Sequence, residues 1–177
     1  MRGIEIESAC AYQQIRRVRC LEQKRAIIVD HPMRFLGGEG PAVKFVACAR
    51  DDAMEAGDDE VNLLLEEGWR PEDVALLTTG TRHPEQKERH AAGHAAYWDS
   101  FWDADQVFYG HVLGFKGLER RAVVLVVNEE SAVERSRERL YVGLSRARDQ
   151  LVVCADPEFI REVGGPDLAR RLNMSET

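Results

Sequence analysis

The chain has 177 residues, a formal net charge of −7 at pH 7, and 44% hydrophobic and 31% charged residues. This length suffices for one domain with its own apolar core, and the composition excludes a low-complexity or membrane-embedded chain. The acidic balance argues against a general nucleic-acid binder, because such proteins carry surplus Lys and Arg to meet phosphates.

Residues 1–36 form an N-terminal segment to which we assign no packing. It joins an arginine-rich stretch to the apolar run at residues 26–30, and three glycines follow at residues 37–40. Residues 37–177 are predicted to form a single domain. No apolar run approaches the roughly 20 residues that span a bilayer, and no signal-peptide pattern opens the chain. We therefore expect a cytoplasmic protein with no membrane partner.

Five short apolar runs rich in β-branched residues recur along the predicted domain, at residues 43–48, 74–78, 107–111, 123–127 and 151–155. Such runs are typical of strands that are buried on both faces of a parallel sheet. They are the candidate strands of this domain.

Helical patterns lie between or after these runs. An apolar stripe over residues 51–67 predicts an amphipathic helix that ends at Gly68. A second helix is predicted at about residues 132–148, with Ala147 in its apolar stripe, and a third follows Pro157. Strands that alternate with helices at these intervals predict a doubly wound α/β domain, in which helices cover both faces of a parallel sheet.

Residues 79–105 depart from this alternation and are interpreted as a compact insertion, because they are rich in His, Gly, Trp and charge. His90 and His94 are spaced four apart, but the segment lacks the glutamate of H-E-x-x-H and a third ligand. The four cysteines form no C-x-x-C pair. We therefore predict no metal site. The nearby aromatic residues Tyr97, Trp98, Phe101 and Trp102 could stack on unpaired bases, although core or hinge packing is the favoured interpretation.

Residues 107–127 (VFYGHVLGFKGLERRAVVLVV) contain the first segment that indicates chemistry. A strand leads into a turn with Lys116 and Gly117, Glu119 follows, and a second strand begins. Glycines in such a turn let backbone amides approach a polyanion, and the lysine adds positive charge. Taken alone, a Lys-Gly pair is equally typical of an ordinary turn.

Residues 139–153 (RLYVGLSRARDQLVV) form the second segment. Arg146 follows Arg139 by seven residues, nearly two helical turns, so both are expected on the same side of the predicted helix. A guanidinium suits a phosphoryl group because its planar fork binds two oxygens and stays charged. In isolation, a solvated basic helix face is the alternative.

Together and in this order, the two segments resemble motifs V and VI of UvrD/Rep-like superfamily 1 DNA helicases. Motif V is a strand followed by K-G-L-E, matched at residues 116–119, and motif VI is Y-V-(A/G)-x-(T/S)-R-A, matched at residues 141–147. The resemblance covers roughly residues 37–156. It implies that residues 37–177 are the second RecA-like domain, the C-terminal motor domain, of an ATP-dependent DNA helicase or translocase.

The resemblance also implies roles for individual residues. Arg146 would act as an arginine finger on the γ-phosphate of ATP, Glu119 would bind the nucleotide sugar, and Lys116 and Gly117 would complete the nucleotide contacts. Gly110 and His111 would lie near the backbone of single-stranded DNA. His111 stands where the family has a threonine, so the DNA contacts depart from the family pattern. Nucleotide is expected at the carboxyl ends of the strands.

The phosphate loop is missing from the sequence. No Gly precedes a Lys, which excludes G-x-x-x-x-G-K-[ST], and no apolar strand ends in Asp-Glu. ATP and Mg²⁺ would therefore be held mainly by an N-terminal RecA-like partner domain, and the chain is not expected to be active alone. Two alternatives stay open: a non-enzymatic helicase-like module used for binding or regulation, and an unrelated α/β domain that binds another anion.

Overall fold

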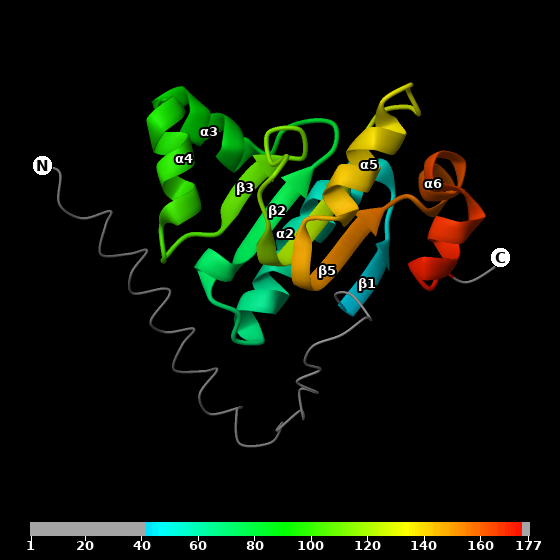
Figure 1. The fold of residues 1–177 in the computed structure, drawn as a ribbon, viewed down its shortest axis with the longest axis horizontal. Helices are drawn as coiled ribbons and strands as arrows, with labels where there is room; N and C mark the ends of the chain where they lie inside the picture. Colours follow the sequence, from blue (N-terminus) through cyan, green and yellow to red (C-terminus); the bar gives the residue numbers. More distant parts are fainter. Residues whose placement is uncertain (1–41, 175–177) are drawn as a thin grey trace, which may run out of the picture. The chain divides into compact units, whose positions relative to one another are not determined.

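A computed structural model describes residues 42–174, so the predicted N-terminal segment lies outside the described residues. Five strands form one sheet in the order β1-β5-β4-β2-β3, and every neighbouring pair is parallel (Figure 1). The strands are β1 (Ala42–Ala47), β2 (Val74–Thr78), β3 (Phe108–His111), β4 (Arg120–Val127) and β5 (Ala147–Ala155). All five predicted strands are confirmed.

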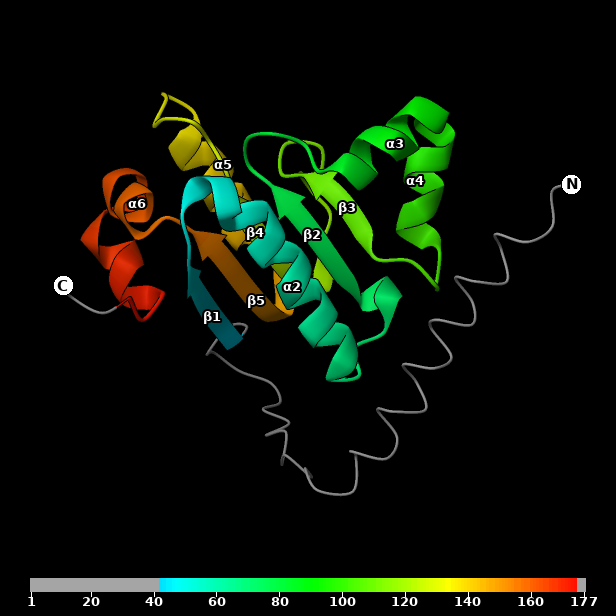
Figure 2. The ribbon, with the colours of Figure 1, turned by 180° about the vertical axis from the view of Figure 1, so that it is seen from behind.

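Helices cover both faces of the sheet, as predicted. They are α2 (Ala53–Glu66), α3 (Pro84–Ala92), α4 (His94–Trp102), α5 (Ser136–Leu144) and α6 (Pro157–Arg171), with 3₁₀ turns η1 (Arg50–Asp52) and η2 (Pro71–Asp73). In Figure 2 α2 lies in front of the sheet, whereas α5 lies in front of it in Figure 1. Val61 and Leu64 of α2 pack in one apolar cluster, and Tyr97, Leu140 and Ile160 pack in the other. The α/β class is therefore confirmed.

Local sequence explains where the helices begin. Pro157 occupies the first turn of α6, and the Asp156 side chain accepts a hydrogen bond from the backbone N–H of Glu158 at 2.7 Å. Pro84 opens α3 in the same way, and His83 Nδ1 accepts from the backbone N–H of Glu85 at 3.1 Å. Both starts therefore combine a proline with a side chain that satisfies an unpaired helical N–H.

Residues 79–105 contain α3 and α4, which are joined at Gly93. Tyr97 and Phe101 of α4 are 3% and 6% exposed and belong to the larger core cluster, so core packing is confirmed for them. Trp102 is 79% exposed and takes no part in that cluster. The segment is thus a helical part of the domain, closed onto the sheet by aromatic side chains.

The predicted helix at residues 132–148 is wrong at both ends. The helix α5 spans only Ser136–Leu144, and β5 already begins at Ala147, which pairs with Arg120 of β4. Arg146 therefore lies in the turn between them, while Arg139 lies on the helix. Ala147 is a small apolar residue that fits an apolar helix stripe and a strand packed against the core equally well. Its pairing with β4 therefore decides that it belongs to β5.

Gly143 explains how α5 reaches the sheet. A Cβ at this position would lie 2.5 Å from Leu125 Cδ1 and 3.2 Å from Val112 Cγ1. Only a glycine therefore lets this turn of α5 approach β4 so closely without displacing core side chains. The close contact at Gly143 therefore holds the last turn of α5 against β4. The turn that contains Arg146 follows directly.

Candidate functional site

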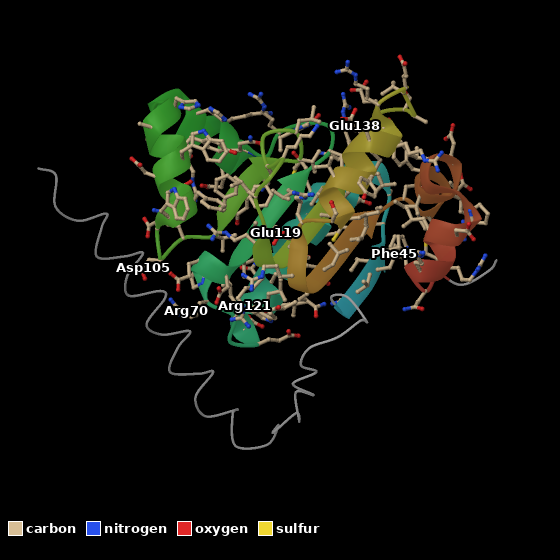
Figure 3. The ribbon with its side chains drawn as sticks, viewed as in Figure 1. Phe45, Arg70, Asp105, Glu119, Arg121 and Glu138 are labelled. Atoms are coloured by element: carbon tan, nitrogen blue, oxygen red, sulfur yellow. The ribbon has the colours of Figure 1, made fainter. Side chains whose placement is uncertain are left out.

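Glu119 and Arg146 lie on the same edge of the sheet. Glu119 directly precedes β4 and Arg146 directly precedes β5, and these two strands are neighbours. The backbone N–H of Arg120 donates to the carbonyl oxygen of Arg146 at 3.1 Å. Figure 3 shows Glu119 and Arg121 at this end of β4. We call the amino ends of β4 and β5, with these two residues, the amino rim.

The Arg146 guanidinium is held by three oxygens. Nε donates to the Val142 carbonyl at 3.0 Å, Nη1 donates to the Leu118 carbonyl at 3.2 Å, and Nη2 donates to Ser145 Oγ at 2.8 Å. A guanidinium has five N–H groups, so two of them have no acceptor among residues 42–174. The side chain is therefore positioned by its own turn and keeps donors for an anion.

Glu119 and Gly117 are accessible to a ligand at the amino rim. The Glu119 side chain is exposed and has no hydrogen-bond or ion-pair partner in the described part of the chain. Gly117 has φ of 88°, a conformation that favours glycine, and a Cβ placed there would meet no atom within 4 Å. The backbone conformation, and not crowding, requires glycine at this position. A ligand could therefore approach this turn without displacing other side chains.

Lys116 lies apart from this group. Its side chain is 72% exposed, and Nζ is 3.9 Å from Oε1 of Glu138, in the first turn of α5. Figure 3 shows Glu138 at one end of α5 and Glu119 near the other. The structure thus gathers Gly117, Glu119 and Arg146 near one rim and places Lys116 beside the start of α5.

The expected position of the nucleotide at the carboxyl ends of the strands does not fit these residues. Glu119 and Arg146 both precede their strands, so they lie at the amino ends. The rule for open α/β sheets describes ligands held by the loops that follow the strands. In this chain the candidate residues come instead from connections that lead into strands, and the sequence pattern did not distinguish these two edges.

Gly110 and His111 lie at the opposite edge, where β3 ends. A Cβ on Gly110 would lie 2.6 Å from Phe108 Cε1 and 3.3 Å from the Tyr97 hydroxyl oxygen, so aromatic side chains already cover this glycine. The backbone N–H of Leu113 donates to His111 Nδ1 at 3.2 Å, and His111 Nε2 is 3.0 Å from the Thr79 carbonyl.

These contacts define the tautomer of His111. A backbone N–H can only donate, so Nδ1 is the acceptor and Nε2 carries the hydrogen that the Thr79 carbonyl receives. Both ring nitrogens of the neutral imidazole are therefore engaged by backbone atoms. His111 fixes the loop after β2 to the end of β3, and its contact with DNA stays a prediction.

Burial lowers the pKa of His111 from its usual 6.5, while the bond to Thr79 opposes the shift and Arg139 adds to it. A lowered imidazole pKa favours the neutral form in the folded state, so its contribution to stability is present above about pH 6.5 and is lost as the pH falls below it.

We expect the free energy of unfolding to decline between about pH 7.5 and about pH 5.5, and to decline less in His111→Asn. Chemical denaturation at both pH values measures this. His94→Asn, on the exposed face of α4, serves as the control, and equal declines in wild type and His111→Asn would contradict the prediction.

An ion pair that the sequence patterns do not indicate lies at the carboxyl edge, between the buried carboxylate of Glu129 and the partly buried guanidinium of Arg139. The Glu129 side chain is 3% exposed, and its Oε2 accepts from Ser136 Oγ at 2.6 Å and from Arg139 Nη1 at 3.1 Å. Glu129 Oε1 and Arg139 Nε are buried without a hydrogen-bond partner among the described residues. The pair ties the first turns of α5 to the end of β4. The only local signal for this pair is a glutamate two residues after an apolar strand, and it does not identify the partner arginine.

An all-parallel sheet with helices on both faces places this chain among α/β domains of the RecA-like type. The family model of the UvrD-like helicase C-terminal domain matches residues 111–154, from the last residue of β3 into β5. Both predicted motifs lie inside this match. Residues 111–154 are therefore similar to the C-terminal domain of UvrD-like helicases, which is a helicase motor domain, and the predicted resemblance is confirmed for this segment. No curated protein matches the chain. Within residues 42–174, no helix is long and apolar enough to cross a membrane.

Proposed function

We propose that this domain supplies the second part of an ATP site shared with an N-terminal RecA-like domain, in an ATP-dependent DNA helicase or translocase. One observation carries the proposal: Arg146 and Glu119 share the amino rim within the segment that matches the family. Arg146 would bind the γ-phosphate, Glu119 the nucleotide sugar, and Gly117 would allow close approach of the backbone. Lys116 points to the start of α5, where its Nζ is 3.9 Å from Oε1 of Glu138, so its predicted contact with the nucleotide stays a prediction.

The chemistry that ATP supplies is a phosphoryl group for transfer to water. Arg146 would stabilise the negative charge that develops during this transfer, as an arginine finger does. Its guanidinium is already fixed by three oxygens and has two uncommitted N–H groups, so binding two phosphoryl oxygens requires little rearrangement. The fit between these donors and a phosphoryl group supports the assignment.

Mg²⁺ would be held by the partner domain that carries the phosphate loop. Among the described residues there is no group of three His, Cys, Asp or Glu side chains suited to a metal ion. The proposed contribution of this chain is therefore charge stabilisation and nucleotide positioning, and it includes no metal coordination.

Single-stranded DNA would bind near the carboxyl end of β3, where Gly110 and His111 lie. The connection at residues 112–119 leads from that end of β3 to the amino rim, so one segment joins the two proposed sites. Closure of the interdomain cleft when ATP binds, followed by reopening after hydrolysis, would move the two domains along DNA.

A cytoplasmic location also stays a prediction.

We expect ATP to strengthen the association of this chain with the N-terminal RecA-like domain. With Mg²⁺ and a non-hydrolysable ATP analogue, the association constant should rise roughly 5- to 150-fold, the range of coupled binding equilibria. Analytical ultracentrifugation with and without the analogue measures this effect. Glu119→Ala should reduce the increase, whereas Arg148→Ala, which changes an exposed arginine of β5, should preserve it.

Nucleotide-independent association would contradict this proposal. The non-enzymatic module predicts tight binding that is equal with and without the analogue. Only a shared ATP site requires nucleotide at the interface between the two domains. The net charge of −7 and the missing phosphate loop are the sequence features that favour this second candidate.

A further inference from the structure

Trp102 is an exposed indole at the amino edge of the sheet. It is the last residue of α4, and residues 103–107 lead from it to the start of β3. It is 79% exposed, more than any other large hydrophobic residue of the described part of the chain. Exposed apolar side chains are ordinary when they are scattered singly, so the neighbours of Trp102 decide what it can do.

Arg120 joins the end of α4 to the amino rim. Its guanidinium carbon lies 3.8 Å from the centre of the Phe101 ring, and its Nη2 donates to the Phe101 carbonyl. The Trp102 ring meets the Phe101 ring edge to face, with centroids 4.9 Å apart. Arg120 itself directly follows Glu119, and its backbone N–H donates to the Arg146 carbonyl. One arginine and one aromatic ring therefore connect Trp102 to the amino rim.

Arg146, Glu119 and Trp102 lie in this order along one edge of the sheet. Arg146 precedes β5, Glu119 precedes β4 and Trp102 leads into β3, while the strand order is β5-β4-β2-β3. Figure 3 shows Glu119 between α4 and α5, and both helices pack on the same apolar cluster. Three strand spacings, about 14 Å, separate β5 from β3. The γ-phosphate, sugar and base of an extended nucleoside triphosphate have the same order and span a similar length.

The charges along this edge favour one orientation of a nucleotide. Trp102 is followed by Asp103 and Asp105, and the Asp103 carboxylate is fixed because it accepts from the backbone N–H of Asp105 at 2.9 Å and from Gln106 Nε2 at 2.6 Å. At the other end, the Arg146 guanidinium keeps two uncommitted N–H groups. Carboxylates repel a triphosphate and a guanidinium attracts it. The phosphates are therefore favoured at Arg146, and the uncharged base is favoured at Trp102.

We propose that Trp102 stacks on the base of the nucleotide whose sugar contacts Glu119 and whose γ-phosphate contacts Arg146. This inference rests on the proposed function, because that function places a nucleotide at the amino rim. The family match begins at residue 111, so it does not include Trp102. Aromatic rings accept any base by stacking. Trp102 therefore raises the affinity for nucleotides in general, and for purines most, because their larger rings overlap more of the indole.

Steady-state ATPase kinetics of the two-domain motor, assembled with the N-terminal RecA-like domain, test the base contact. Trp102→Ala should raise the KM for ATP roughly 5- to 20-fold, the lower part of the range for loss of one stacked base, because part of the indole stays in water. The kcat should stay within about twofold, since the base is bound equally before and during phosphoryl transfer. Trp102→Phe should recover much of the affinity, because it keeps an aromatic face.

Leu63→Ala is the matched control. Leu63 is 44% exposed on α2, whose buried residues pack on the other face of the sheet, so this variant loses an exposed apolar side chain far from the amino rim. It should leave the KM for ATP unchanged. Trp102 takes no part in the core clusters, so the denaturation midpoint of Trp102→Ala should stay close to the wild-type value.

Ligands with and without a base separate stacking from an effect on the phosphates. Calorimetry of the motor with a non-hydrolysable ATP analogue and with inorganic tripolyphosphate should show that Trp102→Ala weakens binding of the analogue alone. Equal weakening of both ligands, or unchanged affinity for both, would overturn the proposal. Weaker association of the two domains without nucleotide would make Trp102 a protein contact and would also overturn it. None of these results affects the shared ATP site, which fails only if association with the N-terminal domain is independent of nucleotide.

Discussion

Arg146→Ala is expected to lower the ATPase kcat of the assembled two-domain motor by about 10³-fold or more, the loss seen when an arginine finger is removed. The structure supports this size of effect because the guanidinium is held by the carbonyls of Val142 and Leu118 and by Ser145 Oγ, with two N–H groups uncommitted. Arg146→Lys should recover little, since an ammonium cannot keep those contacts and also bind two phosphoryl oxygens. Steady-state ATPase assays measure both variants.

Two controls separate this chemical effect from a structural one. Arg148→Ala removes an exposed arginine two residues away and should leave kcat close to the wild-type value. Denaturation curves of Arg146→Ala should show a folded domain, because the lost hydrogen bonds join only the α5–β5 turn to Leu118. Near-normal ATPase activity in a folded Arg146→Ala motor would remove the central support of the proposed function.

Arg139→Met is expected to lower the free energy of unfolding by about 1 to 3 kcal/mol, because it leaves the buried Glu129 carboxylate with one donor fewer, while the partly exposed position of Arg139 admits water. Glu129 would remain buried with a 3% exposed side chain and only Ser136 to donate to it. Replacing both residues, in Glu129→Leu/Arg139→Met, should cost less than the single change, because no buried charge is then left alone. Urea denaturation at one fixed pH gives the three free energies.

Arg137→Met is the matched control for this series. Arg137 lies on the same helix, is exposed, and has no hydrogen-bond or ion-pair partner among the described residues. Its replacement should change stability by no more than about 0.5 kcal/mol. If Arg139→Met and Arg137→Met have similar effects, the Glu129–Arg139 pair contributes nothing of the expected size, and the attachment of α5 to the end of β4 has another origin.

The strands could be predicted because a strand that is buried on both faces requires a short, continuous run of apolar residues, and few other elements of this length have that pattern. Val74–Thr78 is apolar except for its last residue and is completely buried, and the prediction matched its bounds. Glu119 and Arg146 could be predicted as neighbours only through the resemblance to helicase motifs. Their separation of 27 residues gives no local indication that β4 and β5 lie side by side.

Other features depend on tertiary contacts that a local pattern does not contain. Ala147 fits an apolar helix stripe as well as a strand, and only its pairing with Arg120 decides between them. The partner of Glu129 lies ten residues further on, across a turn. The position of Trp102 beside the amino rim requires α4 and β4 to be assembled, so composition alone indicated only that residues 79–105 were unusual.

The position of β5 between β1 and β4 has a consequence for synthesis on the ribosome. β5 is the last of the described strands, and it is the only one of them that pairs with β1, through contacts between residues more than 100 positions apart. The sheet therefore cannot be completed until residues 147–155 have left the exit tunnel, and β1 waits without a neighbour until then. Closing such a distant contact is slow, which makes the nascent domain depend on protection of its apolar strands during translation.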